Sequence, residues 1–529
     1  MNEVTVEREP VAYPEWTEYR KKNGLDPLGM QNSSVSLYQT FLPGISNVTQ
    51  RMRYYGLYAW LALRYAKTIG DTNPDSWKRR VRRAEALYAL IASNNGGETG
   101  VAGTEWATEA LAGSPGETID FATAAEPGSE TYYLKQPWGA FGAAYRSQLF
   151  EIGIFDRTDD HEIPLPSKPL GEGLAQAFAE SIGELADLYF ALIERGTVER
   201  SELSQLAPLL PSAIAPQSAE RSFYEDILLT RADAPQARAL SRKLSIQLIL
   251  KIADLLGREP RADEIRWVLY AGCDQESNAL SLGDAALEAQ RARWWVYHAN
   301  DLCHIAHEAL LKFMLDIHGE YPAGLSPARL IGICADTILA QFDTEPPSWA
   351  ALVASTVPAS NAFDLHDPNS EAAMSSHIIR AGRSDESVCP PETAAQALRL
   401  IAILHRRIED TGADISEPLG GFNPDAFRSL LSETRFLDRH REEPFRRILE
   451  GILEKRVIRR HLWVALRKLR HQGDYTFLIE TDDGILRLRE KDGPVFTNPR
   501  LGPAISFLKD IALLGEDGLT DLGRKAVGA

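Results

Sequence analysis

The sequence lacks the features that define membrane, secreted and zinc-binding proteins. Its 529 residues include four cysteines, and none of them forms a Cys-x-x-Cys pair. Scattered cysteines are typical of reduced thiols in a cytosolic protein. The sequence has no run of about 18 apolar residues, the minimum for a membrane span. The first ten residues, MNEVTVEREP, also lack the basic and apolar regions of a signal peptide. We therefore expect a cytoplasmic protein that does not enter a membrane.

Familiar catalytic motifs are missing too. The chain has no Gly-x-Ser-x-Gly segment, and its Gly-rich stretch GGETGVAG (96–103) lacks the Lys-Ser or Lys-Thr ending of a P-loop. Because no motif indicates a bound nucleotide or an activated nucleophile, the sequence predicts no cofactor. It favours a non-enzymatic function.

Helical periodicity dominates the chain, which is too long for a single compact core. The clearest helices are expected over residues 48–67 and over the long stretch 284–318. We predict a mainly α-helical, multidomain protein. The predicted domains are an N-terminal helical domain (1–205), a central helical domain (206–420) with a long irregular loop (341–392), and a C-terminal domain (421–529).

The C-terminal part of the chain changes character. DYTFLIETDDGILRLRE (474–490) has alternating apolar residues on both sides of Asp483-Gly484, which is typical of a β-hairpin. A helix expected over 498–514 and the segment GLTDLGRKA (518–526) follow. This order resembles the end of a winged-helix domain, so we expect a small winged-helix-like α+β module here.

Charge is distributed unevenly along the chain. The formal net charge of −17 argues against a protein that coats nucleic acid. Residues 435–472, in contrast, contain twelve Lys or Arg and only five Asp or Glu. In the helix expected over EKRVIRRHLWVALRKLR (454–470), four cations share the polar side, Arg456, Arg460, Arg467 and Lys468, and four apolar residues face inward, Val457, Leu462, Leu466 and Leu469.

A basic helix beside a winged-helix-like segment can lay Arg and Lys along a phosphate backbone. The candidate nucleic-acid-binding residues are Arg456, Arg459, Arg460, Arg467, Lys468 and Arg470. The alternative is a solvated helix face whose charge is offset by acidic neighbours such as Glu442, Glu443 and Glu450.

Three ionisable residues share one face of the long helix expected over 284–318. At 100° per residue, Asp301, His304 and Glu308 lie within about 60° of one another. Carboxylates beside an imidazole could bind a divalent metal ion or carry out acid–base chemistry. The order HIAHE is not the HExxH of zinc peptidases, however, and no second helix offers identifiable ligands. The favoured interpretation is a buried polar network that joins packed helices.

Four Arg residues precede a His at the spacing seen in a class of helical ribonucleases. In those enzymes Arg holds phosphate and His moves the proton of the 2′-hydroxyl. The pairs here are Arg293/His298, Arg399/His405, Arg435/His440 and Arg456/His461. Because chance supplies about two such matches, the pattern only leaves open an alternative function, that of a metal-dependent or metal-free nuclease.

The stretch LPGISNVTQRMRYYGLYAWL (42–61) combines a turn with an aromatic helix. Pro43-Gly44 is turn chemistry, and Arg51 and Arg53 follow near the helix start, where the helix dipole disfavours cations. We therefore expect these two guanidinium groups to be paired with carboxylates or to bind an anion, which could belong to a partner.

The segment LDPLGMQNSSVSLYQTFLPGISNVTQRMRYYGLYAWL (25–61) resembles a family of uncharacterised bacterial proteins encoded among antiviral defence genes. The matching positions are Leu28, Gly29, Leu42, Pro43, Gly44, Ser46, Arg51, Arg53, Tyr54 and Tyr55. The resemblance implies a bacterial cytosolic protein that works with helicase- or nuclease-type partners in phage defence, and it implies no catalytic residues. We therefore expect a partner-docking subunit that binds DNA or RNA.

Overall fold

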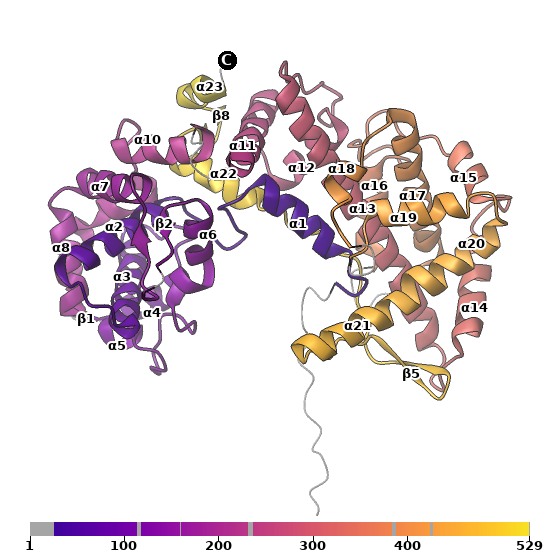
Figure 1. Ribbon diagram of the computed structural model, residues 1–529, viewed down its shortest axis with the longest axis horizontal. Helices are drawn as coiled ribbons and strands as arrows, with labels where there is room; N and C mark the ends of the chain where they lie inside the picture. The colour runs from indigo at the N-terminus through magenta and orange to yellow at the C-terminus, as the bar shows by residue number, and fades with distance from the viewer. Residues whose placement is uncertain are drawn as a thin grey trace, which may run out of the picture.

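The computed structural model describes residues 26–113, 118–158, 160–230, 236–382, 388–423 and 427–527. These residues form a mainly α-helical protein, as predicted, with a few small two-stranded antiparallel sheets. Most helices gather in two lobes, and the remaining helices lie between the lobes (Figure 1). None of the described helices is long and apolar enough to cross a membrane.

The first lobe is built around two long helices, α2 (Arg53–Thr68) and α3 (Pro74–Asn94). Asn73 caps α3 by accepting a hydrogen bond from the Asp75 N–H, and Pro74 occupies the first turn, where its missing N–H costs nothing. The smaller helices of this lobe are α4 (Thr104–Gly113), α5 (Ala122–Ala125), α6 (Arg146–Glu151), α7 (Leu170–Ile182), α8 (Leu185–Arg195), α9 (Arg200–Gln205) and α10 (Ala219–Glu225). Its two sheets pair β1 (Thr118–Asp120) with β4 (Thr197–Glu199), and β2 (Phe155–Asp156) with β3 (Leu165–Pro166).

The second lobe is organised around α13 (Ala285–Gly319), the long helix that the periodicity predicted. Every residue of α13 from 296 to 316 is buried, so neighbours surround the helix on all sides. The other helices of this lobe are α14 (Pro327–Leu339), α15 (Trp349–Ser355), α16 (Glu371–Gly382), α17 (Pro391–Thr411), α18 (Ser416–Leu419), α19 (Leu430–Arg439), α20 (Phe445–Gly451) and α21 (Arg459–Gln472). Because α15 and α16 lie within 341–392, the prediction of one long irregular loop there was wrong.

The predicted hairpin is confirmed in the second lobe. Strands β5 (Ile479–Asp482) and β6 (Ile485–Leu488) pair in antiparallel register around Asp483 and Gly484. Both turn residues have positive φ angles, 47° and 77°, as a two-residue hairpin turn requires. The Leu486 N–H also donates to the Leu325 carbonyl oxygen, which fixes the hairpin beside the start of α14.

The elements between the lobes come from three distant parts of the chain. They are α1 (Gln31–Phe41), α11 (Gln236–Leu256), α12 (Ala262–Ala271), α22 (Leu501–Asp510), β7 (Leu514–Gly515), β8 (Gly518–Leu519) and α23 (Asp521–Val527). Helix α1 reaches from the first lobe to the second and packs on α11 and α13 (Figure 1).

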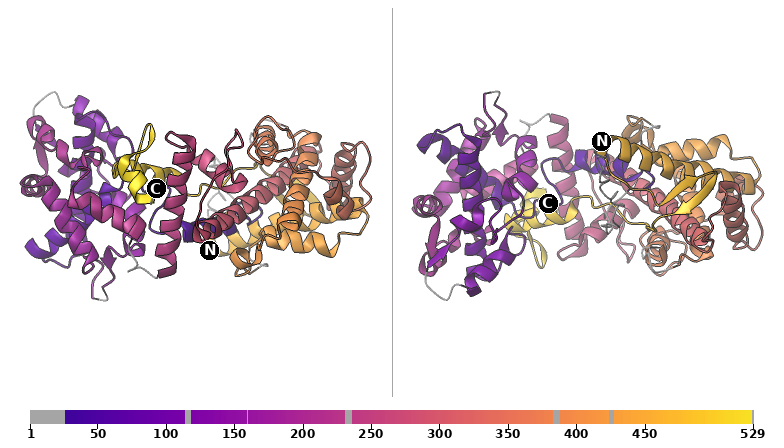
Figure 2. Two further views of the ribbon diagram at one scale, coloured as in Figure 1. Left: turned by 90° about the horizontal axis from the view of Figure 1, so that it is seen from above. Right: turned by 90° about the horizontal axis from the view of Figure 1, so that it is seen from below.

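The segment 421–529, predicted as one C-terminal domain, is spread over two places. Helix α21 and hairpin β5–β6 belong to the second lobe, whereas α22 packs on α12, and β8 and α23 pack on α11 (Figures 1 and 2). The elements of a winged helix therefore follow in the expected order, but the helix–hairpin part and the last helices are separated in space.

The two arginines at the start of the aromatic helix are paired inside the protein. Arg51 lies 2.8 Å from Asp510 of α22 and 2.9 Å from Glu98. Arg53 is fully buried and forms two 3.0 Å hydrogen bonds to Glu220. This placement selects the carboxylate alternative for both side chains. Arg51 also joins the first lobe to α22, 459 residues further along the chain.

We expect Arg51→Leu to lower the free energy of unfolding by about 3 kcal/mol, because it leaves a buried carboxylate unpaired. The Asp510 side chain is 5% exposed and also accepts the Met52 N–H at 2.8 Å. Denaturant or thermal unfolding followed by circular dichroism measures the loss.

The double variant Arg51→Leu/Asp510→Asn is the control, since it removes the charge and keeps an acceptor for Met52. It should be more stable than Arg51→Leu alone. An Arg51→Leu protein as stable as the wild type would contradict this role.

Candidate nucleic-acid interface

Helix α21 lies along an edge of the second lobe and carries the predicted basic surface (Figure 1). It continues from α20 through a wider, π-type stretch, Ile452–Ile458. Such a stretch has more residues per turn than an α-helix, so it rotates the faces of the following helix relative to a regular 100° spacing. Of the four apolar residues predicted to face inward, Val457 is fully buried and Leu462 packs against the core, whereas Leu466 and Leu469 are exposed.

Two of the six candidate cations are buried. The Arg456 guanidinium donates to both carboxylate oxygens of Glu433, at 2.6 and 2.7 Å, and lies 4.6 Å from the centroid of the Phe436 ring. Arg460 Nε donates to the Leu28 carbonyl oxygen at 2.7 Å, and burial lowers the pKa of Arg460 to about 10. Both side chains are buried, which corrects the expectation that they contact nucleic acid.

The other candidate cations lie at the surface or close to it. Arg467 and Arg470 are exposed, and Arg459 is 70% exposed and pairs with Glu454 at 2.9 Å. Lys468 is half-buried, and its ammonium group donates to the Asp26 carbonyl oxygen at 3.3 Å. The exposed cationic part of α21 is therefore smaller than the sequence suggested.

Apolar side chains accompany these cations. Trp463, Leu466 and Leu469 are 40%, 40% and 39% exposed, although the two leucines were predicted to pack inward. The α21 surface is defined here as Arg459, Trp463, Leu466, Arg467, Leu469 and Arg470. Sequence reasoning missed Trp463, although an aromatic residue within a basic helix is a signal for contact with bases.

His461, on the buried side of α21, fixes the helix through two hydrogen bonds. Its Nε2 atom accepts a hydrogen bond from the Leu478 N–H at 2.9 Å, so the proton is on Nδ1, which donates to the Pro27 carbonyl oxygen at 3.2 Å. Burial lowers the pKa of His461 to about 4. The neutral ring therefore ties α21 both to the hairpin and to the segment before α1.

The three ionisable residues singled out on α13 do come together. His304 Nδ1 lies 3.4 Å from Asp301 Oδ1, and His304 Nε2 lies 2.8 Å from Glu308 Oε1. Burial disfavours the imidazolium, but the Glu308 charge and the hydrogen bonds to both carboxylates outweigh burial and raise the pKa of His304. The group is thus a charged triad inside the helix packing.

The triad has the character of a structural network. Asp301 accepts hydrogen bonds from the N–H and the hydroxyl of Thr497, and Glu308 accepts one from Gln31. All three side chains of the triad are at most 2% exposed. Among the described residues, no group of three or more His, Cys, Asp or Glu is arranged to hold a metal ion. The geometry therefore favours the network interpretation over the metal site.

The Arg/His pairs are mostly split between surface and core. His298 and His405 are buried, whereas Arg293 and Arg399 are exposed. The pair Arg456/His461 is buried as a whole. Arg435 is exposed and His440 is half-buried, so within the described ranges this last pair remains accessible to a substrate.

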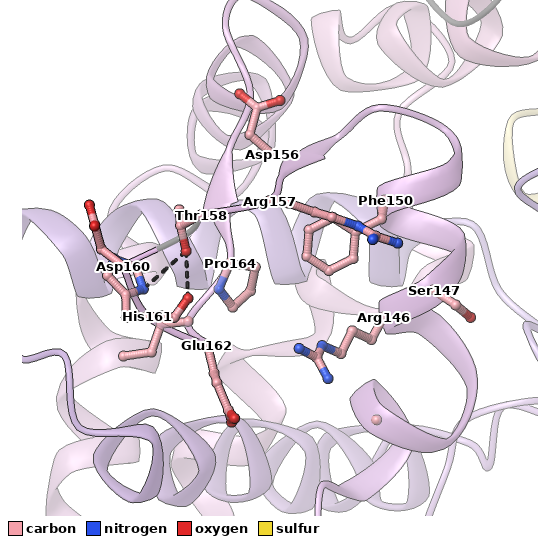
Figure 3. A pocket seen from close by; sticks show the side chains of 12 residues that line it. Arg146, Ser147, Phe150, Asp156, Arg157, Thr158, Asp160, His161, Glu162 and Pro164 are labelled. Atoms are coloured by element: carbon pink, nitrogen blue, oxygen red, sulfur yellow. Dashed lines mark hydrogen bonds between the residues drawn. The ribbon is translucent and has the colours of Figure 1, made fainter.

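Other cavities are lined mostly by different residues, although Arg293 lines one of them. One, of about 660 Å³, lies in the first lobe beside α6, and Figure 3 shows Arg146 and Arg157 on one side of it and His161 and Glu162 on another. Another, of about 650 Å³, lies between α12, α13 and α17. The lining of the first cavity mixes both signs of charge and therefore selects no single class of ligand.

Comparison of the chain with protein-family models, with curated proteins and with solved structures finds no match. The functional argument therefore depends on the geometry of the site.

The buried His461 predicts an acid-sensitive fold. A histidine in the unfolded chain has a pKa near 6.5, so between about pH 6.5 and 4 the unfolded chain binds a proton that folded His461 does not. This stabilisation is present above pH 6.5 and is lost as the pH falls toward 4, by up to about 3 kcal/mol. We expect His461→Gln to have a shallower loss of thermal unfolding midpoint between pH 7.5 and 4.5 than the wild type.

The matched control is His471→Gln, because His471 is an exposed histidine of the same helix. Its pH dependence should equal that of the wild type. Identical pH dependence of the wild type and His461→Gln would refute the assignment.

Proposed function

We propose that the protein is a non-enzymatic subunit of a bacterial antiviral defence system and that it binds DNA or RNA through the α21 surface. In this proposal it works in the cytoplasm, and its helical body docks other subunits such as a helicase or a nuclease. The observation that carries the proposal is the α21 surface, where exposed Arg459, Arg467 and Arg470 lie on the same side of the helix as exposed Trp463.

The charge of α21 supports a polyanionic ligand. Residues 459–472 contain five Lys or Arg and no Asp or Glu. This helix belongs to a chain with a formal net charge of −17, so most of the remaining surface repels a polyanion. Arg and Lys that neutralise phosphates supply most of the affinity of nonspecific nucleic-acid binding. A local contact through α21 is the arrangement that these charges favour.

The proposal does not require a complete winged helix. Helix α21 and the hairpin remain joined through His461, whereas α22 and α23 lie elsewhere. The contact with nucleic acid is therefore assigned to the face of one helix and not to a helix inserted with a flanking wing.

The resemblance of residues 25–61 to defence-associated proteins supports the biological setting. In this structure the motif serves the fold, since Leu28 and Leu42 are fully buried. Gly44 has a φ angle of 77°, and its carbonyl oxygen accepts the Tyr55 hydroxyl at 2.6 Å. The proposed docking of partner subunits therefore uses other surfaces of the helical body.

One observation favours a second candidate, a metal-free nuclease. His440 lines a cavity of about 670 Å³ together with Arg447, and its Nδ1 atom lies 2.8 Å from Glu443 Oε1. An imidazole oriented by a carboxylate beside a cation has the elements of acid–base cleavage of RNA. The buried triad of α13 offers no comparable access for a substrate.

We expect Arg467→Glu/Arg470→Glu to weaken binding of fluorescein-labelled oligonucleotides at least tenfold at 100 mM salt. The plot of log affinity against log salt should flatten by between one and two units, because about two phosphate contacts are lost. Fluorescence anisotropy over 50–300 mM salt measures both quantities.

The control variant Lys67→Glu/Lys525→Glu changes the net charge equally at exposed positions outside the second lobe. It should bind as the wild type does. The α21 assignment fails if both double variants keep wild-type affinity, and the proposed function fails if the wild type binds neither DNA nor RNA.

We also expect the purified protein to leave labelled single- and double-stranded DNA and RNA intact, with Mg²⁺ or with EDTA. His440→Ala should behave identically, since the proposed function involves no cleavage. RNA cleavage that persists in EDTA and disappears in His440→Ala would replace the proposal with the nuclease.

A further inference from the structure

We infer that the α21 surface binds single-stranded nucleic acid and that Trp463 stacks on its bases. The inference rests on the proposed function of this surface and specifies its ligand. It starts from the exposed apolar side chains that lie beside the cations on one helix face. Contacts between cations and phosphates do not explain why these apolar side chains are exposed there.

The apolar part of the surface is continuous along α21. Trp463, Leu466 and Leu469 follow at intervals of three residues, so they lie on one side of the helix. The outer surface of a duplex offers phosphates to a helix, and phosphates gain nothing from contact with Leu or Trp. A single strand also offers the flat faces of its bases, and these stack on aromatic side chains in a sequence-tolerant way.

The indole ring of Trp463 packs on a buried guanidinium group. The Arg460 guanidinium lies 4.5 Å from the Trp463 ring centroid and is fixed by its hydrogen bond to the Leu28 carbonyl oxygen. Because Arg460 is buried, this contact supports the ring from the inner side of the helix. A ring that is already oriented loses little conformational entropy when a ligand binds.

A second cation lies over the indole. The guanidinium carbon of Arg467, an exposed residue, lies 5.4 Å from the Trp463 centroid and 5.6 Å from the Phe427 centroid, so it makes cation–π contacts with both rings. The face thus offers an aromatic plane from Trp463 and positive charge from Arg467, which matches a ligand that carries bases and phosphates.

The experiment compares one 20-nucleotide mixed-sequence oligonucleotide, labelled with fluorescein, as a single strand and as a duplex with its complement. The full-length protein should bind the single strand at least tenfold more tightly. Trp463→Ala should weaken binding to the single strand about 5- to 150-fold and leave duplex affinity and the salt slope unchanged.

Two further variants separate stacking from folding. Trp463→Phe keeps an aromatic ring over Arg460 and should retain most of the affinity for the single strand, whereas Trp463→Leu keeps only apolar bulk and should lose it. Leu365→Ser, at an exposed apolar position outside the α21 surface, should bind as the wild type does. Adding the single strand should also quench more tryptophan fluorescence in the wild type than in Trp463→Phe.

The outcomes distinguish this inference from the proposed function. Salt-dependent binding that is equal for both strand forms, or that is unchanged in Trp463→Ala and Trp463→Leu, overturns the inference and leaves the proposed function standing. Unchanged binding in these variants would mean that the apolar strip serves another ligand, such as a partner protein. Absence of binding to either strand form overturns both.

Discussion

The charged triad of Asp301, His304 and Glu308 is the interaction on which the arrangement of the second lobe depends. Residues 296–316 of α13 are all buried, so the ionisable groups among them must find partners inside the protein. The imidazolium neutralises part of the charge of the two carboxylates, and their remaining acceptor capacity is used by distant segments. Thr497 bonds to Asp301, and Gln31 bonds to Glu308. A polar helix face thereby fixes both α1 and the segment that leads to α22, and it does so because unpaired charge in a core is costly.

Residues near the start of the described chain bond to helices in its last hundred residues. Leu28 and Pro27 hold Arg460 and His461 of α21 through their carbonyl oxygens, and Arg51 holds Asp510 of α22. The same stretch contains the motif that resembles defence-associated proteins. Its residues are explained here by folding, since they supply buried side chains, a left-handed turn and internal ion pairs. These contacts join segments that the sequence analysis assigned to different predicted domains.

These contacts decide which side chains of α21 stay exposed and can bind a ligand. Arg460 is drawn inward by carbonyl acceptors and Arg456 by Glu433, so the helix turns Trp463 and Leu466 toward solvent. Because these two arginines are buried, the surface carries less positive charge than a count of Lys and Arg in the sequence suggests. The resulting face has fewer cations than expected and a larger apolar area. Its proposed ligand is therefore one that offers bases as well as phosphates.

The sequence by itself determined the local structure. The periodicity over 284–318 located α13 to within a residue at each end, and Asp483-Gly484 located the hairpin, because both signals depend on neighbouring residues only. It also suggested that Asp301, His304 and Glu308 form a network, since helical spacing alone brings them together. Only the tertiary structure decided the partners of Arg51, the separation of α22 from α21 and the inward face of α21. Those outcomes depend on hydrogen-bond acceptors hundreds of residues away in the sequence. Such acceptors allow polar side chains to be buried in the core, and local hydrophobic patterns contain no information about which acceptors will be near.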